Sequence, residues 1–173
     1  WRRHLYRILA LGWQGTDRQW RHYNSLYGFL AALATPLVVS VHSIVSWDFA
    51  MSILPGWHST IFAPYFVAGA ILSGVAMVIT ILIPLRKWLG WEEYIRIWHF
   101  ENLAKLLILT SLIVGYAYLT EYFIAWYSNN PFEQGTFLDR MFGQYALFAW
   151  TMLLCNAVIP LVLFFKKVRT NLV

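Results

Sequence analysis

Four long apolar stretches separated by short polar segments make up most of the sequence. They cover residues 27–47, 61–85, 103–126 and 145–165, and each is bordered by charged or aromatic residues. An α-helix rises about 1.5 Å per residue, so about 20 residues cross the hydrocarbon core of a bilayer, which is about 30 Å thick. The pattern therefore predicts an all-α integral membrane protein, a bundle of four transmembrane helices.

Composition supports this prediction and limits the chemistry. Of the 173 residues, 60% are hydrophobic and 12% are charged, whereas about a quarter of the residues of a typical soluble domain are charged. The single cysteine, Cys155, lies in the fourth apolar stretch, so no cysteine-based metal or iron–sulfur site is expected. We predict that this chain itself binds no metal and no cofactor, and that any electron carrier belongs to another subunit.

The lysine and arginine residues are unevenly distributed among the connecting segments. They cluster before the first stretch, around the loop between the second and third, and after the fourth: Arg2, Arg3, Arg7, Arg18, Arg21, Arg86, Lys87, Arg96, Lys105, Lys166, Lys167 and Arg169. The two other loops carry only Arg140. Positive residues in short loops stay cytoplasmic, so both ends of this segment are expected on the cytoplasmic side. This rule accounts for the net charge of +5, and we expect membrane lipid rather than nucleic acid as a partner.

The first 25 residues differ from the rest because basic and aromatic side chains such as Arg3 and Trp13 alternate along them. This mixture is typical of a helix that lies at the level of the lipid headgroups. We therefore divide the chain into an interfacial amphipathic segment, 1–25, and a transmembrane bundle, 26–173. Because the sequence does not begin with methionine, we expect it to be an ordered piece of a longer polypeptide.

Two titratable residues lie near the outer end of the first stretch. His42 is within the apolar run, and Asp48 follows six residues later at the membrane boundary. An imidazole and a carboxylate accept protons near neutral pH, so these residues are candidates for binding and deprotonating a quinol headgroup. His58, in the turn before the second stretch, is near enough to the outer face to join such a pocket. The alternative is structural, with His42 hydrogen-bonded to a neighbouring helix and Asp48 capping the next helix.

The third stretch carries acidic residues toward both ends. Glu121 lies toward the outer end beside Tyr116 and Tyr118, whereas Glu101 and Lys105 form an i,i+4 pair at the inner end. A membrane-embedded carboxylate among hydroxyl groups is typical of a proton relay, so these five residues are candidates for a proton path. The alternative is that Glu121 makes an interhelical hydrogen bond and that the Glu101–Lys105 pair is structural.

Four prolines, Pro36, Pro64, Pro84 and Pro160, lie in or near the ends of the apolar stretches. A proline inside a helix has no N–H to donate, so neighbouring helices or polar side chains must satisfy the freed carbonyl within the membrane. Such contacts are expected in a close-packed bundle.

Longer runs of sequence carry a more specific signal. Residues 41–50 (VHSIVSWDFA), 55–70 (PGWHSTIFAPYFVAGA), 101–105 (ENLAK) and 115–128 resemble the NrfD-like (polysulfide-reductase membrane subunit) family. Within this family the resemblance is strongest to the large integral membrane subunits of bacterial alternative complex III. It extends over nearly the whole chain.

The resemblance implies a fold of two four-helix bundles, of which this chain is similar to the second. It implies a membrane subunit without a redox centre of its own, in a bacterial inner membrane, that binds menaquinol or ubiquinol as substrate near the outer face. Electrons would pass to an iron–sulfur subunit and then to multihaem cytochrome c subunits, and a paralogous NrfD-like subunit would be present. On this basis His42 and Asp48 correspond to polar positions facing the quinol, and Glu121 to a proton path.

Three classes of function stay open from the sequence. A quinol-oxidising subunit predicts that His42 and Asp48 line a pocket facing an iron–sulfur protein. A proton-translocating module predicts a polar chain that starts at Glu101 and Lys105. This chain would continue through the hydroxyl groups of the spans to Glu121 and Asp48. A scaffold for peripheral redox subunits predicts that these groups pair with one another and line no cavity.

Overall fold

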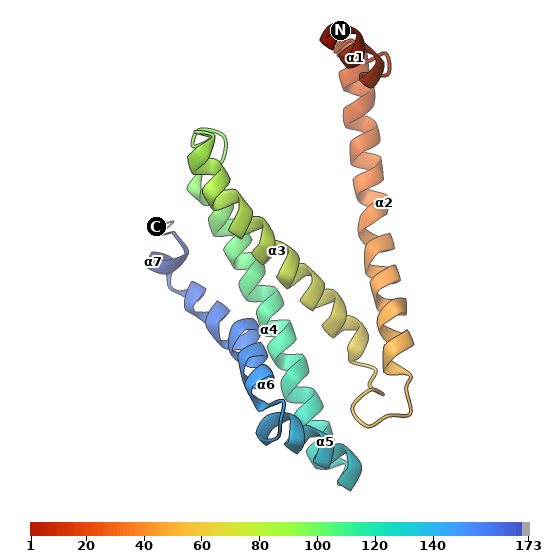
Figure 1. Ribbon diagram of the computed structural model, residues 1–173, viewed down its shortest axis with the longest axis vertical. Coiled ribbons are helices and arrows are strands. Elements are labelled where there is room, and N and C mark those ends of the chain that lie inside the picture. The colour runs from red at the N-terminus through yellow and green to blue at the C-terminus, as the bar shows by residue number, and fades with distance from the viewer. Residues whose placement is uncertain (171–173) are drawn as a thin grey trace. The chain divides into compact units, whose positions relative to one another are not determined.

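The computed structural model describes residues 1–170, and within them the chain is helical with no β-strand (Figure 1). Four helical segments are long and apolar enough to cross a membrane: Asp17–Ala50, Phe62–Trp88, Ile97–Tyr127 and Ala146–Phe164. Each contains most or all of one predicted stretch, so the all-α membrane fold with four spans is confirmed. The chain divides into two compact units, Trp1–Val41 and the part that begins at His42, and these are described separately.

The first unit contains α1 (Arg2–Leu9) and most of α2 (Asp17–Ala50). At the start of α2 the rings of Trp13, Trp20 and Tyr23 form an edge-to-face cluster, with centroids 5.2 to 6.2 Å apart. Such aromatic clusters are common at the membrane interface. The division into an interfacial segment 1–25 and a bundle 26–173 stays a prediction.

The second unit is built around an antiparallel hairpin of α3 (Phe62–Trp88) and α4 (Ile97–Tyr127), which lie side by side in Figure 1. Their shared core contains Ala68, Leu72, Leu107, Val114 and Tyr118. Small residues such as Ala68 allow the two backbones to approach closely, which is how membrane helices commonly pack. The connection between the helices is held where Arg86 Nε donates to the carbonyl of Ile95 at 2.7 Å.

A short helix, α5 (Pro131–Phe142), follows α4 and was not among the predicted spans. The Asn130 side chain accepts a hydrogen bond from the Phe132 N–H at 3.0 Å, and Pro131 occupies the first turn. Both are ordinary signals for the start of a helix. The helix packs against the end of α4 and the start of the fourth span.

The fourth span is not one regular α-helix. It begins as α6 (Ala146–Leu153), continues as a π-helical turn, η1 (Leu154–Val158), and ends as a 3₁₀ segment, η2 (Ile159–Phe164). Pro160 explains the change, because it cannot donate an N–H to the carbonyl of Asn156 four residues earlier. Ser111 on α4 supplies the missing donor, since its Oγ donates to that carbonyl at 2.6 Å. At this proline, the expectation that a neighbouring helix satisfies the freed carbonyl is confirmed.

The span is followed by a single helical turn, α7 (Lys166–Arg169). Arg169 Nη2 lies 3.1 Å from Glu101 Oε1 near the start of α4. This ion pair joins the last described turn to the hairpin, at the end of α4 opposite to α5.

Candidate functional site

Polar side chains from three helices meet at the C-terminal end of α4. Because α3 and α4 are antiparallel, the first turn of α3 lies beside the last turns of α4, and α5 folds back onto the same end. Tyr118, Glu121 and Tyr122 are spaced i, i+3 and i+4, so they share one face of α4. Together with Tyr65 on α3 and Arg140 on α5, they line a cavity of about 300 Å³, which we name the polar cavity.

Aromatic contacts fix the walls of the polar cavity. The rings of Tyr65 and Tyr118 lie 5.5 Å apart between centroids. The ring of Tyr122 meets Phe137 of α5 edge to face at 4.9 Å, and the Arg140 guanidinium carbon lies 5.2 Å from the centroid of the Phe137 ring. The polar cavity therefore presents a carboxyl group, phenol hydroxyls and a guanidinium from a largely aromatic frame.

A second cavity, of about 220 Å³, lies next to the first and is named here the His58 cavity. His58 Nε2 is 2.5 Å from Glu133 Oε1, and its Nδ1 is 3.1 Å from the carbonyl oxygen of Leu54. Both ring nitrogens of His58 thus lie within hydrogen-bonding distance of an oxygen atom. Glu121 lines this cavity as well as the polar cavity, so this residue is shared by the two.

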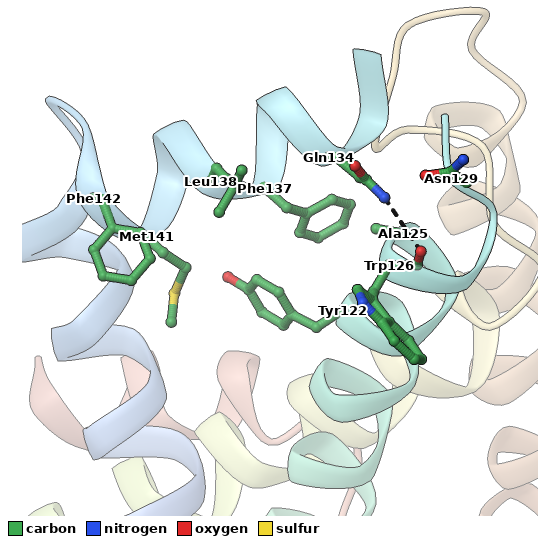
Figure 2. A pocket seen from close by; sticks show the side chains of 9 residues that line it. All are labelled: Tyr122, Ala125, Trp126, Asn129, Gln134, Phe137, Leu138, Met141 and Phe142. Carbon is green, nitrogen blue, oxygen red and sulfur yellow. Dashed lines mark hydrogen bonds between the residues drawn. The ribbon is translucent and has the colours of Figure 1, made fainter. Parts of the chain in front are cut away.

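A third hollow, of about 540 Å³, lies between α4 and α5 and is named the α4–α5 groove. Figure 2 shows the side chains of Tyr122, Phe137, Leu138 and Met141 directed into the space between the two helices. Gln134 Nε2 donates to the carbonyl of Trp126 at 3.2 Å across one end. The other side chains of the lining are Ala125, Trp126, Asn129 and Phe142.

A hydrogen-bonded chain of polar groups lies deeper in the bundle. Ser111 Oγ donates to the Asn156 carbonyl, and Asn156 Nδ2 donates to the hydroxyl of Tyr118 at 3.2 Å. Ser111 is 1% exposed and Tyr118 is 7% exposed. Because Tyr118 also lines the polar cavity, this chain links the cavity to the middle of the fourth span.

The structure separates the residues predicted to bind quinol. His42 is half-buried, with its ring 6.3 Å from that of Phe66, and Asp48 is exposed. Six residues of α-helix turn the direction of a side chain by about 120°, so His42 and Asp48 face different sides of α2. Neither His42 nor Asp48 is among the residues that line the three hollows described above. His58, in contrast, lines the His58 cavity together with Glu133. A quinol-binding role for the three residues stays a prediction.

The predicted proton-path residues are also only partly brought together. Glu101 and Lys105 pair at 3.4 Å, and Arg169 joins them. Tyr118 and Glu121 line the polar cavity, but Tyr116 is 66% exposed and lies away from the hydrogen-bonded chain. A path through all five residues stays a prediction.

Sequence reasoning missed several residues of this site. In the sequence, Arg140 stands out only because it is the single positive residue in the two loops predicted on the outer side. Glu133 stands out only as an acidic residue in one of those loops. Asn156 had a signal, since it is the single amide of its apolar stretch and lies four residues before Pro160. Tyr65 had no local signal, because its place in the cavity follows from how α3 pairs with α4.

Within residues 1–170, no group of three His, Cys, Asp or Glu side chains is arranged to hold a metal ion. The expectation that this chain carries neither metal nor cofactor stays a prediction.

Comparison with known proteins gives a partial similarity. No protein-family model matches the chain. Over 70 residues the chain is 34% identical to a protein of Halobacterium salinarum that is named as a membrane subunit of a dimethyl sulfoxide reductase. The matched region is 40% of this chain and 15% of that protein, so the chain spans only a small part of its relative's length. Four apolar helices and this similarity identify a multi-pass membrane protein.

Proposed function

We propose that this chain is part of the membrane subunit of a respiratory redox complex and that its polar cavity receives the headgroup of a quinol. The similarity to a reductase membrane subunit supports the first part of the proposal. The second part rests on one observation: Glu121 lines both the polar cavity and the His58 cavity. A carboxylate in that position is suited to accept a proton from a ligand on one side and to release it on the other.

The chemistry of the cavity fits the oxidation of a quinol. Oxidation of one quinol to its quinone releases two electrons and two protons. Glu121 is the candidate acceptor for a proton, while the hydroxyls of Tyr65 and Tyr118 are candidates to hydrogen-bond the quinol oxygens. The His58–Glu133 pair lies next to Glu121 and reaches the surface, so it is suited to carry protons outward. The electrons leave to a carrier in a partner subunit.

The finer identity of the complex is part of the proposal. The resemblance to alternative complex III favours quinol oxidation, with an iron–sulfur subunit as electron acceptor, multihaem cytochrome c subunits beyond it and a paralogous NrfD-like subunit beside it. The polar cavity lies at the end of α4 opposite the basic segments around Arg96 and Lys166. By the positive-inside rule this end is the outer face of a bacterial inner membrane, with both ends of the segment cytoplasmic.

The experiment that tests the proposal is quinol oxidation by the intact complex carrying Glu121→Gln, with assembly measured on the same preparation. Loss of a positioned proton acceptor is expected to lower turnover about 100-fold, the lower end of the usual contribution of general acid–base catalysis. Glu93→Gln, in the loop before α4, is the matched control and should leave turnover near the unsubstituted level. Normal turnover in an assembled Glu121→Gln complex would contradict the proposal.

The same measurement on Asp48→Asn separates the two candidate sites. If quinol is deprotonated at the residues predicted from the sequence, Asp48→Asn lowers turnover and Glu121→Gln does not. If it is deprotonated in the polar cavity, the reverse is expected. Asp48 is exposed and faces a different side of α2 from His42, so we expect the second result.

Proton translocation is a second candidate function, favoured by the hydrogen-bonded chain from Ser111 through Asn156 to Tyr118. Ionisable residues at membrane depth commonly mark proton routes, and this chain of hydroxyl and amide groups reaches the cavity that Glu121 lines. Proteoliposomes containing the complex would test this function. Release of more protons than the two that each quinol loses by oxidation would support translocation, and release of only two would rule it out.

A further inference from the structure

The α4–α5 groove continues into the polar region of the site. Tyr122 lines both the groove and the polar cavity, and Phe137 lines both the groove and the His58 cavity. These two rings meet edge to face at 4.9 Å. One aromatic pair therefore forms a wall shared by the groove and the two polar hollows.

The groove itself is suited to an apolar chain. Its volume of about 540 Å³ falls within the range of about 300 to 1,000 Å³ that is usual for small-molecule sites. Leu138, Met141 and Phe142 of α5 line it together with Trp126 of α4. Methionine adapts its shape to flexible apolar ligands. The polar side chains Gln134 and Asn129 lie toward the end near Trp126, where the Gln134 amide donates to the Trp126 carbonyl.

The position of the groove along the helices fits a ligand that is partly in lipid. It lies at the end of the apolar helix α4, where the capped helix α5 begins at Pro131. The lining residues Trp126 and Phe142 are 71% and 76% exposed. Exposed aromatic side chains are enriched at the lipid interface, so we expect the groove to open to the outer part of the bilayer.

We infer that the α4–α5 groove holds the isoprenoid tail of the quinol whose headgroup occupies the polar cavity. This inference rests on the proposed function and adds the tail site. An isoprenoid chain matches the largely apolar lining, and the shared lining residues Tyr122 and Phe137 connect the tail site to the headgroup site. The far end of the tail then lies in the lipid.

Filling the groove tests the inference in the intact complex. Met141→Trp places a larger, rigid side chain in the groove without touching Glu121, Tyr65 or Tyr118. The measurement compares kcat/KM for a quinol with its natural long tail and for duroquinol, which has no tail. We expect kcat/KM for the tailed quinol to fall at least about tenfold, because two buried methylene groups already account for that factor. For duroquinol we expect a change of less than about twofold.

Leu119→Trp is the matched control, because Leu119 is on α4, is 73% exposed and lies outside the groove lining. It should affect neither substrate. Equal loss for both quinols with Met141→Trp, or no loss for either, would overturn the tail site while leaving quinol oxidation intact. If the unsubstituted complex oxidises neither quinol, the proposed function itself is refuted. This result differs from the results that refute the tail site alone, so the two cases can be distinguished.

A labelling experiment covers the case in which Met141→Trp does not assemble. A quinone with a photoreactive group on its tail is irradiated with the unsubstituted complex, and the labelled peptides are mapped. Label in α5 that is displaced by long-tailed quinol but not by duroquinol supports the tail site. The tail site is contradicted if the label is absent from α4 and α5, or if phospholipid alone displaces the label equally well. It is also contradicted if a polypeptide segment is found cross-linked into the groove in place of the quinone.

Discussion

Substituting Ser111 by alanine should destabilise the protein more than an ordinary serine-to-alanine change in a membrane helix. Ser111 Oγ donates at 2.6 Å to the Asn156 carbonyl, and Pro160 has no N–H to donate to that carbonyl in its place. Ser111 is 1% exposed, so water does not readily replace the lost donor. The alanine variant therefore leaves a buried acceptor without this partner.

The expected cost follows from these contacts. Interhelical hydrogen bonds in membrane proteins contribute about 0.6 kcal/mol on average and up to about 1.7 kcal/mol. An unsatisfied buried polar group costs about 1 to 3 kcal/mol. Because Pro160 removes the usual backbone donor, we expect a loss near the upper end of the first range, about 1.5 kcal/mol. Alanine also favours the helix by about 0.5 kcal/mol over serine, which makes the observed loss smaller.

Equilibrium unfolding of the full subunit in lipid bicelles measures this cost. Ser73→Ala is the matched control, since Ser73 on α3 is exposed and donates within its own helix to the Ala70 carbonyl at 3.1 Å. The difference between the two variants isolates the interhelical bond. Adding Pro160→Ala restores a backbone N–H and should reduce the cost of Ser111→Ala. Equal costs for Ser111→Ala and Ser73→Ala, or the same Ser111→Ala cost in both backgrounds, would refute the reasoning.

Two further predictions concern other parts of the second unit. Gly56 has a φ of +80°, where alanine costs about 1 to 2 kcal/mol, so Gly56→Ala should lower the melting temperature of the subunit. Gly28→Ala in α2 should not, and similar melting temperatures for the two variants would contradict this account. Arg169→Gln removes the ion pair with Glu101 at 3.1 Å and should lower stability slightly in low salt and less in high salt, because salt screens the attraction between the two charges. Unfolding at two salt concentrations tests this, with Lys167→Gln as control, and a loss that does not vary with salt would show that charge is not its cause.

The four spans were predictable because of a simple constraint. In lipid no water is present to bond the backbone polar groups, so a long apolar stretch forms a helix, which satisfies nearly all of these groups internally. The same reasoning does not show where a helix ends outside the lipid. For this reason α2 begins at Asp17, ten residues before the first apolar stretch at residue 27. The irregular geometry of the fourth span was expected only in part, from Pro160.

The candidate site was harder to predict because it is assembled from distant residues. Glu121 is conspicuous in the sequence because it is an acid in an apolar stretch. The start of α5 was readable from Asn130 and Pro131, but a local signal does not reveal that α5 folds back toward the end of α4. Arg140 and Glu133 reach their neighbours only through that fold. The sequence predicts that His42 and Asp48 line one pocket, although side chains six residues apart on a helix point about 120° apart.

The π-helical turn η1 has a consequence for how this span tolerates change in length. A π turn holds one more residue than the α turn it replaces, and each residue of a helix turns the following side chains by about 100°. Deleting one residue between Leu154 and Val158 would restore regular winding but would rotate everything after it. Pro160 would then meet a different surface of α4, and Arg169 would turn away from Glu101. The number of residues in this span therefore has to match two things: the thickness of the bilayer, and the orientation about the helix axis that brings Pro160 and Arg169 to their partners on α4.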